Sequence, residues 1–268
     1  MNILGKASQL IESNSPFVLT TVIESKGSSP GKSGFKMIVL SNGETIGTVG
    51  GGAIEVKVKE HAMVLLNNGC NEFKDYLLDA DKEVLNSEKE IVPMMCKGSI
   101  KIYYEVFGKM PTLYVFGGGH VGQALCKLIA DIGYYTILID NRKDFATREK
   151  NPYPNDIIHA DYLEYADEFK PQGNSFVVIL THGHKYDFGI LQKILSRKLS
   201  VKYIGVIASN SKAAKIVNDI KESLGKDVDL SMLHSPIGLK IGGDSAIEIA
   251  LSIAAEMQSV RYNQKLVF

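Results

Sequence analysis

Short apolar runs alternate with helix-spaced apolar positions through the second half of the chain. The runs typical of buried strands are Thr112–Phe116, Tyr135–Ile139, Ile157–His159, Ser175–Leu180 and Tyr203–Ile207. The helical patterns between and after them are Val121–Ile132, Leu163–Phe169, Ile190–Leu195, Lys212–Ser223 and a last segment from Asp244 or Ser245 onward. Strands that alternate with helices at this spacing predict an α/β fold with a Rossmann-like, doubly wound parallel sheet.

The first half of the chain has a mixed pattern. Apolar segments predict strands at Phe17–Ile23, Lys36–Leu40, Thr45–Val49 and Ser99–Val106, and helical spacing predicts helices at Ile3–Glu12 and directly after residue 52. Asn42-Gly43, between two of these strands, is a strong signal for a hairpin turn. We therefore expect a smaller α+β domain at residues 1–108. Gly, Lys and Pro after Phe107 predict a short linker, and a Rossmann-like domain follows at 111–268.

The composition narrows the class of protein. The chain has 268 residues with 30 basic and 30 acidic side chains, and its formal net charge is zero. This balance argues against a nucleic-acid-binding protein, which needs a surplus of Lys and Arg on one face. No apolar run approaches the ~20 residues that span a bilayer, and the N-terminus lacks the apolar block of a signal peptide. Three scattered cysteines do not make a disulfide framework, so we expect a cytoplasmic protein that binds neither nucleic acid nor membrane.

A glycine pattern at the start of the second domain is typical of dinucleotide binding. Gly117, Gly119 and Gly122 have the G-x-G-x-x-G spacing between a predicted strand and a predicted helix. The glycines permit a tight turn, a close approach to a pyrophosphate, and close packing of helix on strand. Asp140 ends the next predicted strand, where a carboxylate accepts hydrogen bonds from a ribose diol and repels a 2′-phosphate. The pattern predicts a site for NAD(P) or another nucleotide, and the alternative is a Rossmann turn without a nucleotide.

A second glycine turn lies in the first domain. Gly50, Gly51 and Gly52 come directly before a predicted helix. Consecutive glycines give a ligand close access to the backbone, and the amides at a helix start favour an anion. Glu55 lies in the first turn of that helix. It is either part of a binding site or an acid that stabilises the positive end of the helix dipole.

Cys96 is the candidate nucleophile or sulfur ligand. It lies just before a predicted strand and next to Lys97, whose charge favours the thiolate. A thiolate can hold sulfur or bind a soft metal. The alternative is an inert, buried thiol.

Three histidines are candidates for contact with a ligand. His120 lies in the glycine turn of the second domain, and His182 and His184 follow a predicted parallel strand, at the sheet edge where ligands bind in open α/β folds. Because no zinc-type spacing appears, we expect ligand contacts or acid–base chemistry there and no metal site. These histidines would donate protons in an NAD(P)-dependent oxidoreductase, which is one alternative function. An interaction module without catalysis is another.

Longer motifs give the chain a resemblance to a known family. In the first half they are Gly27-Ser28-Ser29-Pro30, the segment from Gly43 to Gly52, and Glu55. In the second half they are Val115 to Val121, Thr181 to His184 with Tyr186-Asp187, Tyr203-Ile204-Gly205, His234 to Leu239 and Glu248-Ile249-Ala250. Over nearly its whole length the chain resembles the xanthine dehydrogenase accessory proteins of the XdhC/CoxI type.

The resemblance implies an accessory role rather than turnover of a metabolite. Proteins of this type bind the molybdenum cofactor, protect it while a cysteine desulfurase supplies a terminal sulfur, and deliver it to a molybdenum hydroxylase such as xanthine dehydrogenase. The resemblance also implies a homodimer. Two positions depart from the family pattern, because Ala53 replaces a frequent Cys after the three glycines and Cys96-Lys97-Gly98 replaces Cys-Gly-Gly. In this chain Cys96 would therefore handle sulfur or molybdenum alone, or the role of the chain would differ.

Overall fold

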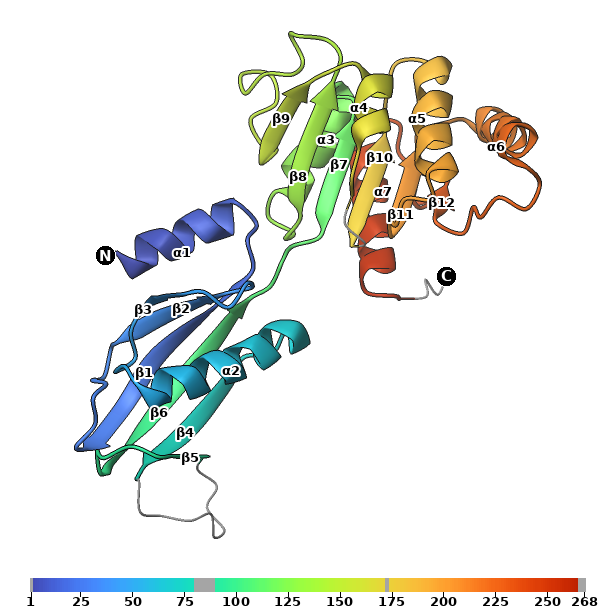
Figure 1. Cartoon of the computed structure of the whole chain (residues 1–268). Coiled ribbons are helices and arrows are strands. Elements are labelled where there is room, and N and C mark those ends of the chain that lie inside the picture. Colours follow the sequence, from blue (N-terminus) through green and yellow to red (C-terminus); the bar gives the residue numbers. More distant parts are fainter. Residues whose placement is uncertain (1, 80–89, 172–173, 265–268) are drawn as a thin grey trace. The chain divides into compact units, whose positions relative to one another are not determined.

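The computed structural model describes residues 2–79, 90–171 and 174–264, and the chain forms two compact units (Figure 1). Unit 1 covers residues 1–109 and unit 2 covers 110–268. The elements of unit 1 are α1 (Ile3–Glu12), β1 (Phe17–Gly27), β2 (Lys36–Leu40), β3 (Thr45–Gly47), α2 (Ala53–Asn68), β4 (Glu72–Leu78), β5 (Glu90–Val92) and β6 (Gly98–Phe107).

The described strands of unit 1 form one mixed sheet with a helix on each face. The strand order is β3-β2-β1-β6-β4-β5, and each pair is antiparallel except β4 with β5. Side chains alternate along β1, so that Phe17 and Leu19 pack with α1 whereas Val18 and Val22 pack with α2. This is the predicted α+β arrangement, with a core on both sides of the sheet.

Most elements predicted in unit 1 are present, and the differences have local causes. The hairpin at Asn42-Gly43 is confirmed by the antiparallel pairing of β2 with β3. Strand β1 continues four residues past Ile23, because its end pairs with the start of β6. Strand β4 was not predicted. Its first half is mostly polar, and the side chain of Phe73 is exposed, so this half lacks the alternation of buried apolar residues that indicates a strand.

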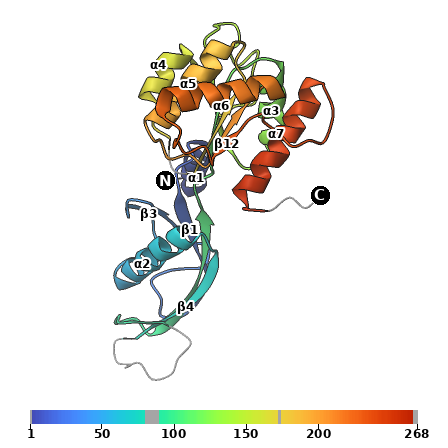
Figure 2. The ribbon, with the colours of Figure 1, turned by 90° about the vertical axis from the view of Figure 1, so that its right-hand side faces the viewer.

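Unit 2 is a Rossmann-like domain. Its elements are β7 (Thr112–Phe116), α3 (His120–Ile129), β8 (Tyr135–Asp140), β9 (Asp156–His159), α4 (Tyr162–Glu168), β10 (Ser175–Ile179), α5 (His184–Ser196), β11 (Tyr203–Val206), α6 (Asn210–Leu224), β12 (Leu233–His234) and α7 (Ala246–Arg261). The described strands form a parallel sheet in the order β12-β11-β10-β7-β8-β9. Helices α3 and α7 cover one face, and α4, α5 and α6 cover the other (Figure 2).

The covering of both faces explains the apolar runs of the sequence. All five residues of β7 and all five of β10 are buried, because these central strands meet helices on each side. The predicted fold class is therefore confirmed for both units. Helix α7 starts where predicted, with a capping box in which Ser245 and Glu248 bond reciprocally. Among the described residues, no helix has both the length and the apolar character needed to cross a membrane.

Candidate functional site

The candidate residues fall into two groups, one in each unit. In unit 1, three loops meet at the end of the sheet where α2 begins. They are residues 27–31 from the end of β1, residues 48–52 between β3 and α2, and residues 94–98 up to the start of β6. They share this end because β1 and β6 are antiparallel neighbours, with Gly27 paired to Gly98. We call these three loops the glycine-loop cluster.

Direct contacts join the loops of the glycine-loop cluster. The amide of Ser28 donates a hydrogen bond to the carbonyl of Lys97 at 3.1 Å. A Cβ atom added to Gly52 would lie 3.6 Å from Cε of Met94, which is ordinary van der Waals contact. The loop that carries Cys96 therefore packs beside the glycine turn at the start of α2.

Two loops of this cluster lie so close together that two of their glycines have no room for a side chain. A Cβ atom on Gly31 would lie 2.1 Å from the carbonyl oxygen of Val49. A Cβ atom on Gly50 would lie 2.6 Å from the amide nitrogen of Gly31, and the φ of Gly50 is +137°. Glycine is thus required here by close packing of two loops as well as by conformation.

Glu55 bonds to the glycine turn itself. Its Oε1 accepts hydrogen bonds from the hydroxyl of Thr48 at 2.5 Å, the amide of Gly51 at 3.0 Å and the amide of Val49 at 3.2 Å. The carboxylate thus holds the turn in its conformation. Gly52, the N-cap of α2, has no side-chain acceptor for the first-turn amides, which leaves these donors to backbone, solvent or a ligand.

Cys96 is the cysteine of the glycine-loop cluster. Its thiol is half-buried and forms no disulfide, and the neighbouring Met95 is almost fully exposed. Cys70 is exposed beyond the C-terminus of α2. The glycine turn lies at the other end of this helix, whose 16 residues span about 24 Å. Burial raises the pKa of the Cys126 thiol to about 12, so this cysteine in α3 is an inert core residue. Of the three, Cys96 alone lies in a loop that packs beside the glycine turn.

In unit 2 the glycine fingerprint has the geometry of a dinucleotide-binding turn. Gly117 has φ +114°, and a Cβ atom there would lie 2.5 Å from the carbonyl oxygen of Leu180. A Cβ atom on Gly122 would lie 2.0 Å from the carbonyl oxygen of Gly117, so α3 packs directly on the turn. At two of the three fingerprint glycines, neighbouring backbone atoms lie too close for any side chain, as expected for this motif.

The fingerprint lies at the point where the strand order of the sheet reverses. From β7 the chain builds outward through β8 and β9 on one side, then returns to β10 and continues to β12 on the other. The turn after β7 and the turn after β10 touch at Gly117 and Leu180. In open parallel sheets, ligands bind outside the carboxyl ends of the strands at this reversal.

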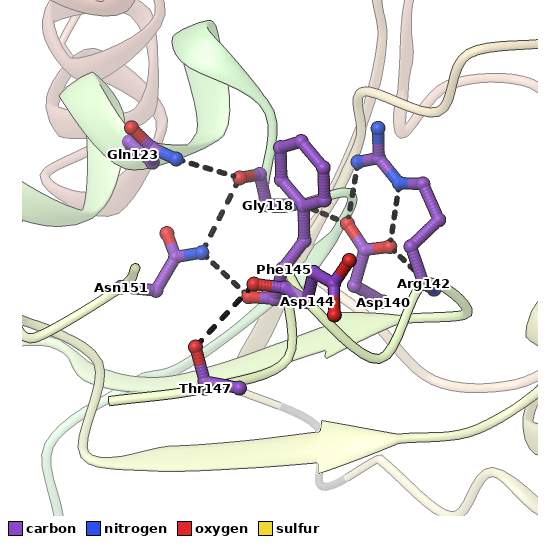
Figure 3. Close-up of polar contacts among 8 residues, drawn as sticks. All are labelled: Gly118, Gln123, Asp140, Arg142, Asp144, Phe145, Thr147 and Asn151. Atoms are coloured by element: carbon purple, nitrogen blue, oxygen red, sulfur yellow. Dashed lines mark hydrogen bonds and ion pairs between the residues drawn. The ribbon is translucent and has the colours of Figure 1, made fainter. Parts of the chain in front are cut away.

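Asp140 is fully buried and already bonded to protein donors (Figure 3). Its Oδ2 accepts from the amide of Gly118 and from Nη2 of Arg142, both at 2.7 Å. Its Oδ1 accepts from the amide and Nε of Arg142, both at 2.9 Å. Burial by itself raises the pKa of this carboxyl, but the bonds from Arg142 and Gly118 outweigh it and hold the pKa below its ordinary value. The carboxylate that we expected to meet a ribose diol thus holds the turn and pairs with an arginine.

Two side-chain amides, which the sequence analysis did not single out, bond to the carbonyl group of the fingerprint turn. The carbonyl of Gly118 accepts from Nε2 of Gln123 at 3.2 Å and from Nδ2 of Asn151 at 3.3 Å (Figure 3). Asn151 also donates to the carbonyl of Phe145 at 2.7 Å and so ties the loop after β8 to the fingerprint. Neither residue has a recognisable spacing, which explains why sequence reasoning missed them.

The histidine candidates lie at the carboxyl edge of the same sheet. His120 is exposed in the first turn of α3, and His182 is exposed after β10 with its ring centroid 5.6 Å from that of Tyr186. His184 is the first residue of α5, and its side chain lies outside the described part of the structure. The expected ligand contacts of these histidines stay predictions.

A buried ion pair follows these histidines. Asp187 is fully buried, and its carboxylate accepts from the hydroxyl of Thr181 at 2.5 Å and from Nζ of Lys212 at 2.9 Å. Lys212 comes from α6 and its side chain is about one third exposed (34%). The pair therefore fixes an ammonium group next to the turn after β10. Asp187 belongs to one of the motifs that carry the family resemblance, but the sequence gives no sign of its lysine partner.

A cavity of about 770 Å³ lies elsewhere in unit 2. It is lined by the C-terminal end of α5, the segment before β11 and the segment after α6, including Leu199, Val228 and Met232. These segments lie at the amino ends of the parallel strands, opposite the fingerprint. None of the candidate residues lines this cavity, so it does not enter the site.

Comparison with protein families now assigns the chain. A model described as the XdhC Rossmann domain matches residues 113–257, and a model described as the XdhC and CoxI family matches residues 10–77. The chain belongs to the XdhC and CoxI family. The resemblance inferred from its motifs is thereby confirmed. The matched ranges contain both glycine turns, whereas Cys96 lies between them.

Similar proteins agree with this assignment. The chain is 29% identical over 264 residues to the uncharacterized protein YqeB of Escherichia coli K12, covering 98% of this chain and 47% of that protein. It is 31% identical over 151 residues to a probable xanthine dehydrogenase subunit of Bacillus subtilis, covering 56% of this chain and 43% of that protein. The chain thus spans less than half the length of these curated relatives.

One solved structure shares the fold along nearly the whole chain. The structure described as a xanthine dehydrogenase from Bacillus halodurans has a TM-score of 0.53 and 20% identity to this chain, with 96% of each chain covered. At this identity the likeness concerns the fold alone. It supports the succession of a mixed-sheet unit and a Rossmann-like unit in one chain.

Proposed function

We propose that this chain binds the molybdenum cofactor, protects it during sulfuration and delivers it to a molybdenum hydroxylase of the xanthine dehydrogenase type. In this proposal the cofactor is cargo, a cysteine desulfurase supplies the sulfur, and the chain acts as a homodimeric accessory protein. Membership in the XdhC and CoxI family supports a link to xanthine dehydrogenase. The residues of unit 1 support the finer claim.

The observation that carries the proposal is that Cys96 lies in a loop that packs beside the glycine turn. The molybdenum cofactor is an anionic pterin with a phosphate and a metal-bound sulfur. The half-buried thiol of Cys96 has the chemistry to contact the metal or its sulfur. The first turn of α2, which has no side-chain cap, offers backbone amides to the phosphate. The thiol lies in the glycine-loop cluster and these amides directly follow it, so the donor set fits this cargo.

A retention experiment tests the proposal. Apoprotein is mixed under nitrogen with cofactor released from a molybdenum enzyme, passed through gel filtration, and assayed by the fluorescence of the oxidised pterin. We expect the wild type to retain the cofactor. Cys96→Ser should reduce retention about tenfold, which corresponds to about 1.4 kcal/mol of binding free energy.

Cys70→Ser is the matched control for this experiment. It makes the same chemical change at an exposed thiol at the far end of α2, so its retention should equal that of the wild type. Absence of retention by the wild type contradicts cofactor binding. Equal losses in the two variants contradict the role of Cys96.

A further inference from the structure

The second strand of a Rossmann sheet ends beside the adenosine ribose of a bound dinucleotide. In this protein that strand is β8, which neighbours β7 and ends at Asp140. The residues at this end select between a free ribose diol and a ribose with a 2′-phosphate. Their contacts therefore indicate which dinucleotide the unit accepts.

Asp140 lacks the free carboxylate that a ribose diol needs. Four N–H groups, one from Gly118 and three from Arg142, occupy its two oxygens. A diol would have to displace a bidentate arginine–carboxylate pair, which is among the stronger polar interactions in proteins. The repulsion that a free Asp140 would exert on a 2′-phosphate is also removed, because Arg142 neutralises the carboxylate at 2.7 Å.

Arg142 presents a cation at the same place. Its guanidinium stacks on the ring of Phe145 at 3.7 Å from the centroid, and its side chain is 34% exposed. Figure 3 shows its third nitrogen directed away from Asp140. Nη2 lies 3.9 Å from the Cβ position of Gly119, the glycine at which a pyrophosphate approaches the backbone. The aromatic ring and the carboxylate fix the orientation of this guanidinium, which is therefore pre-organised to bind a phosphate.

Two buried amide oxygens next to the turn lack hydrogen-bond donors. They are Oδ1 of Asn141 and Oδ1 of Asn151, and neither has a partner among the described residues. Asn151 is 1% exposed, and its Nδ2 bonds to the Gly118 carbonyl. Unsatisfied buried acceptors are unusual, and a ribose hydroxyl would supply the missing donor to either oxygen that a bound dinucleotide uncovers.

We propose that unit 2 binds a dinucleotide with a phosphate on the adenosine 2′ position, NADP(H), in preference to NAD(H), and that Arg142 is the residue that determines this specificity. The glycine turn takes the pyrophosphate, and Arg142 takes the 2′-phosphate. This inference goes beyond cofactor delivery and does not rest on it, because it concerns only residues of unit 2.

Calorimetric titration of the full chain tests the proposal. NADPH should bind at least about tenfold more tightly than NADH, since a charge-assisted bond to the 2′-phosphate is gained. Adenosine 2′,5′-bisphosphate should compete with NADPH, and adenosine 5′-diphosphate should compete at least about tenfold more weakly. This comparison needs no variant and is therefore independent of any folding defect. Equal affinity for NADPH and NADH, tighter NADH binding, or binding of neither overturns the proposal.

Substitution of Arg142 locates the specificity. Arg142→Ser should abolish the preference for NADPH, and because it frees the Asp140 carboxylate it should leave NADH binding equal or stronger. Lys215→Ser removes the same charge from an exposed position of α6 and should keep the wild-type preference. If Arg142→Ser does not fold, Arg142→Lys keeps the charge without the bidentate geometry and should narrow the preference. A preference unchanged in the Arg142 variant that folds overturns the role of Arg142.

Discussion

Neighbouring glycines in the turn before α2 have unequal surroundings. A Cβ atom on Gly50 would meet the backbone of Gly31 at 2.6 Å, whereas a Cβ atom on Gly51 would meet nothing within 4 Å. Both have a positive φ, +137° and +79°. The sequence shows three equivalent letters, and only the structure distinguishes a glycine required by packing from one required by conformation alone.

The two glycines therefore make a matched pair of substitutions. Gly51→Ala should lower the free energy of unfolding by about 1 to 3 kcal/mol, because alanine must adopt a left-handed conformation in open space. Gly50→Ala should cost more, since it adds a clash with backbone atoms that cannot move independently of the loop. Guanidinium-induced unfolding measures both values. Equal costs would show that the approach of Gly50 to Gly31 is not a constraint.

Single residues also show where prediction from sequence stops. The Rossmann spacing correctly placed Asp140 at a strand end, but its partner Arg142 depends on how one side chain folds back, which periodicity does not encode. Glu55 was open to two interpretations, and its bonds to the amides of Val49 and Gly51 show that it holds the turn. Positions follow from pattern, and partners follow from tertiary geometry.

At the scale of elements, one glutamate ties helix α7 to the end of the parallel sheet. Oε2 of Glu256 accepts from the hydroxyl of Tyr203 in β11 at 2.5 Å and from the amide of Gly238 at 3.0 Å. Its Oε1 lies 3.3 Å from Nδ1 of His234 in β12. Burial by itself raises the pKa of Glu256, but the bonds from His234, Tyr203 and Gly238 outweigh it and lower the pKa below its ordinary value.

This shift predicts a stability that depends on pH. A carboxyl with a lower pKa in the folded than in the unfolded state stabilises the fold above its ordinary value of 4.5, and this contribution is lost as the pH falls through the folded value. Unfolding free energy should thus fall below about pH 4.5. The fall should be smaller in Glu256→Gln, whereas the exposed Glu222→Gln control should follow the wild type. Denaturant titrations across this range measure it, and identical curves for the two variants would argue against the anchor.

Helices and strands were predicted correctly where the periodic pattern of apolar residues extends over enough positions to be recognised. The alternation of strands and helices in unit 2 identified the doubly wound sheet, and the apolar spacing after Ser245 predicted α7. The short strands β5 and β12, of three and two residues, were missed. Neither segment shows a readable alternation, and each becomes a strand because a neighbouring strand pairs with it.

On the scale of the whole molecule, each unit carries one glycine turn at the start of a helix. The chain has no net charge, so any anionic ligand would have to be held by local backbone amides and a few placed side chains rather than by a general positive field. Unit 1 adds the thiol of Cys96 to its turn, and unit 2 adds the guanidinium of Arg142. Under the two proposals, the first turn would hold a molybdenum cargo and the second a phosphorylated dinucleotide.

The central claim, that the chain carries the molybdenum cofactor in unit 1, is tested most directly by what the protein contains when purified without oxygen from cells that make the cofactor. Molybdenum is measured by mass spectrometry and the pterin by its fluorescence after oxidation. We expect both in the wild type, in similar molar amounts, and both strongly reduced in Cys96→Ser but not in Cys70→Ser. Wild-type protein that contains neither molybdenum nor pterin, from cells shown to hold the cofactor, would contradict the account.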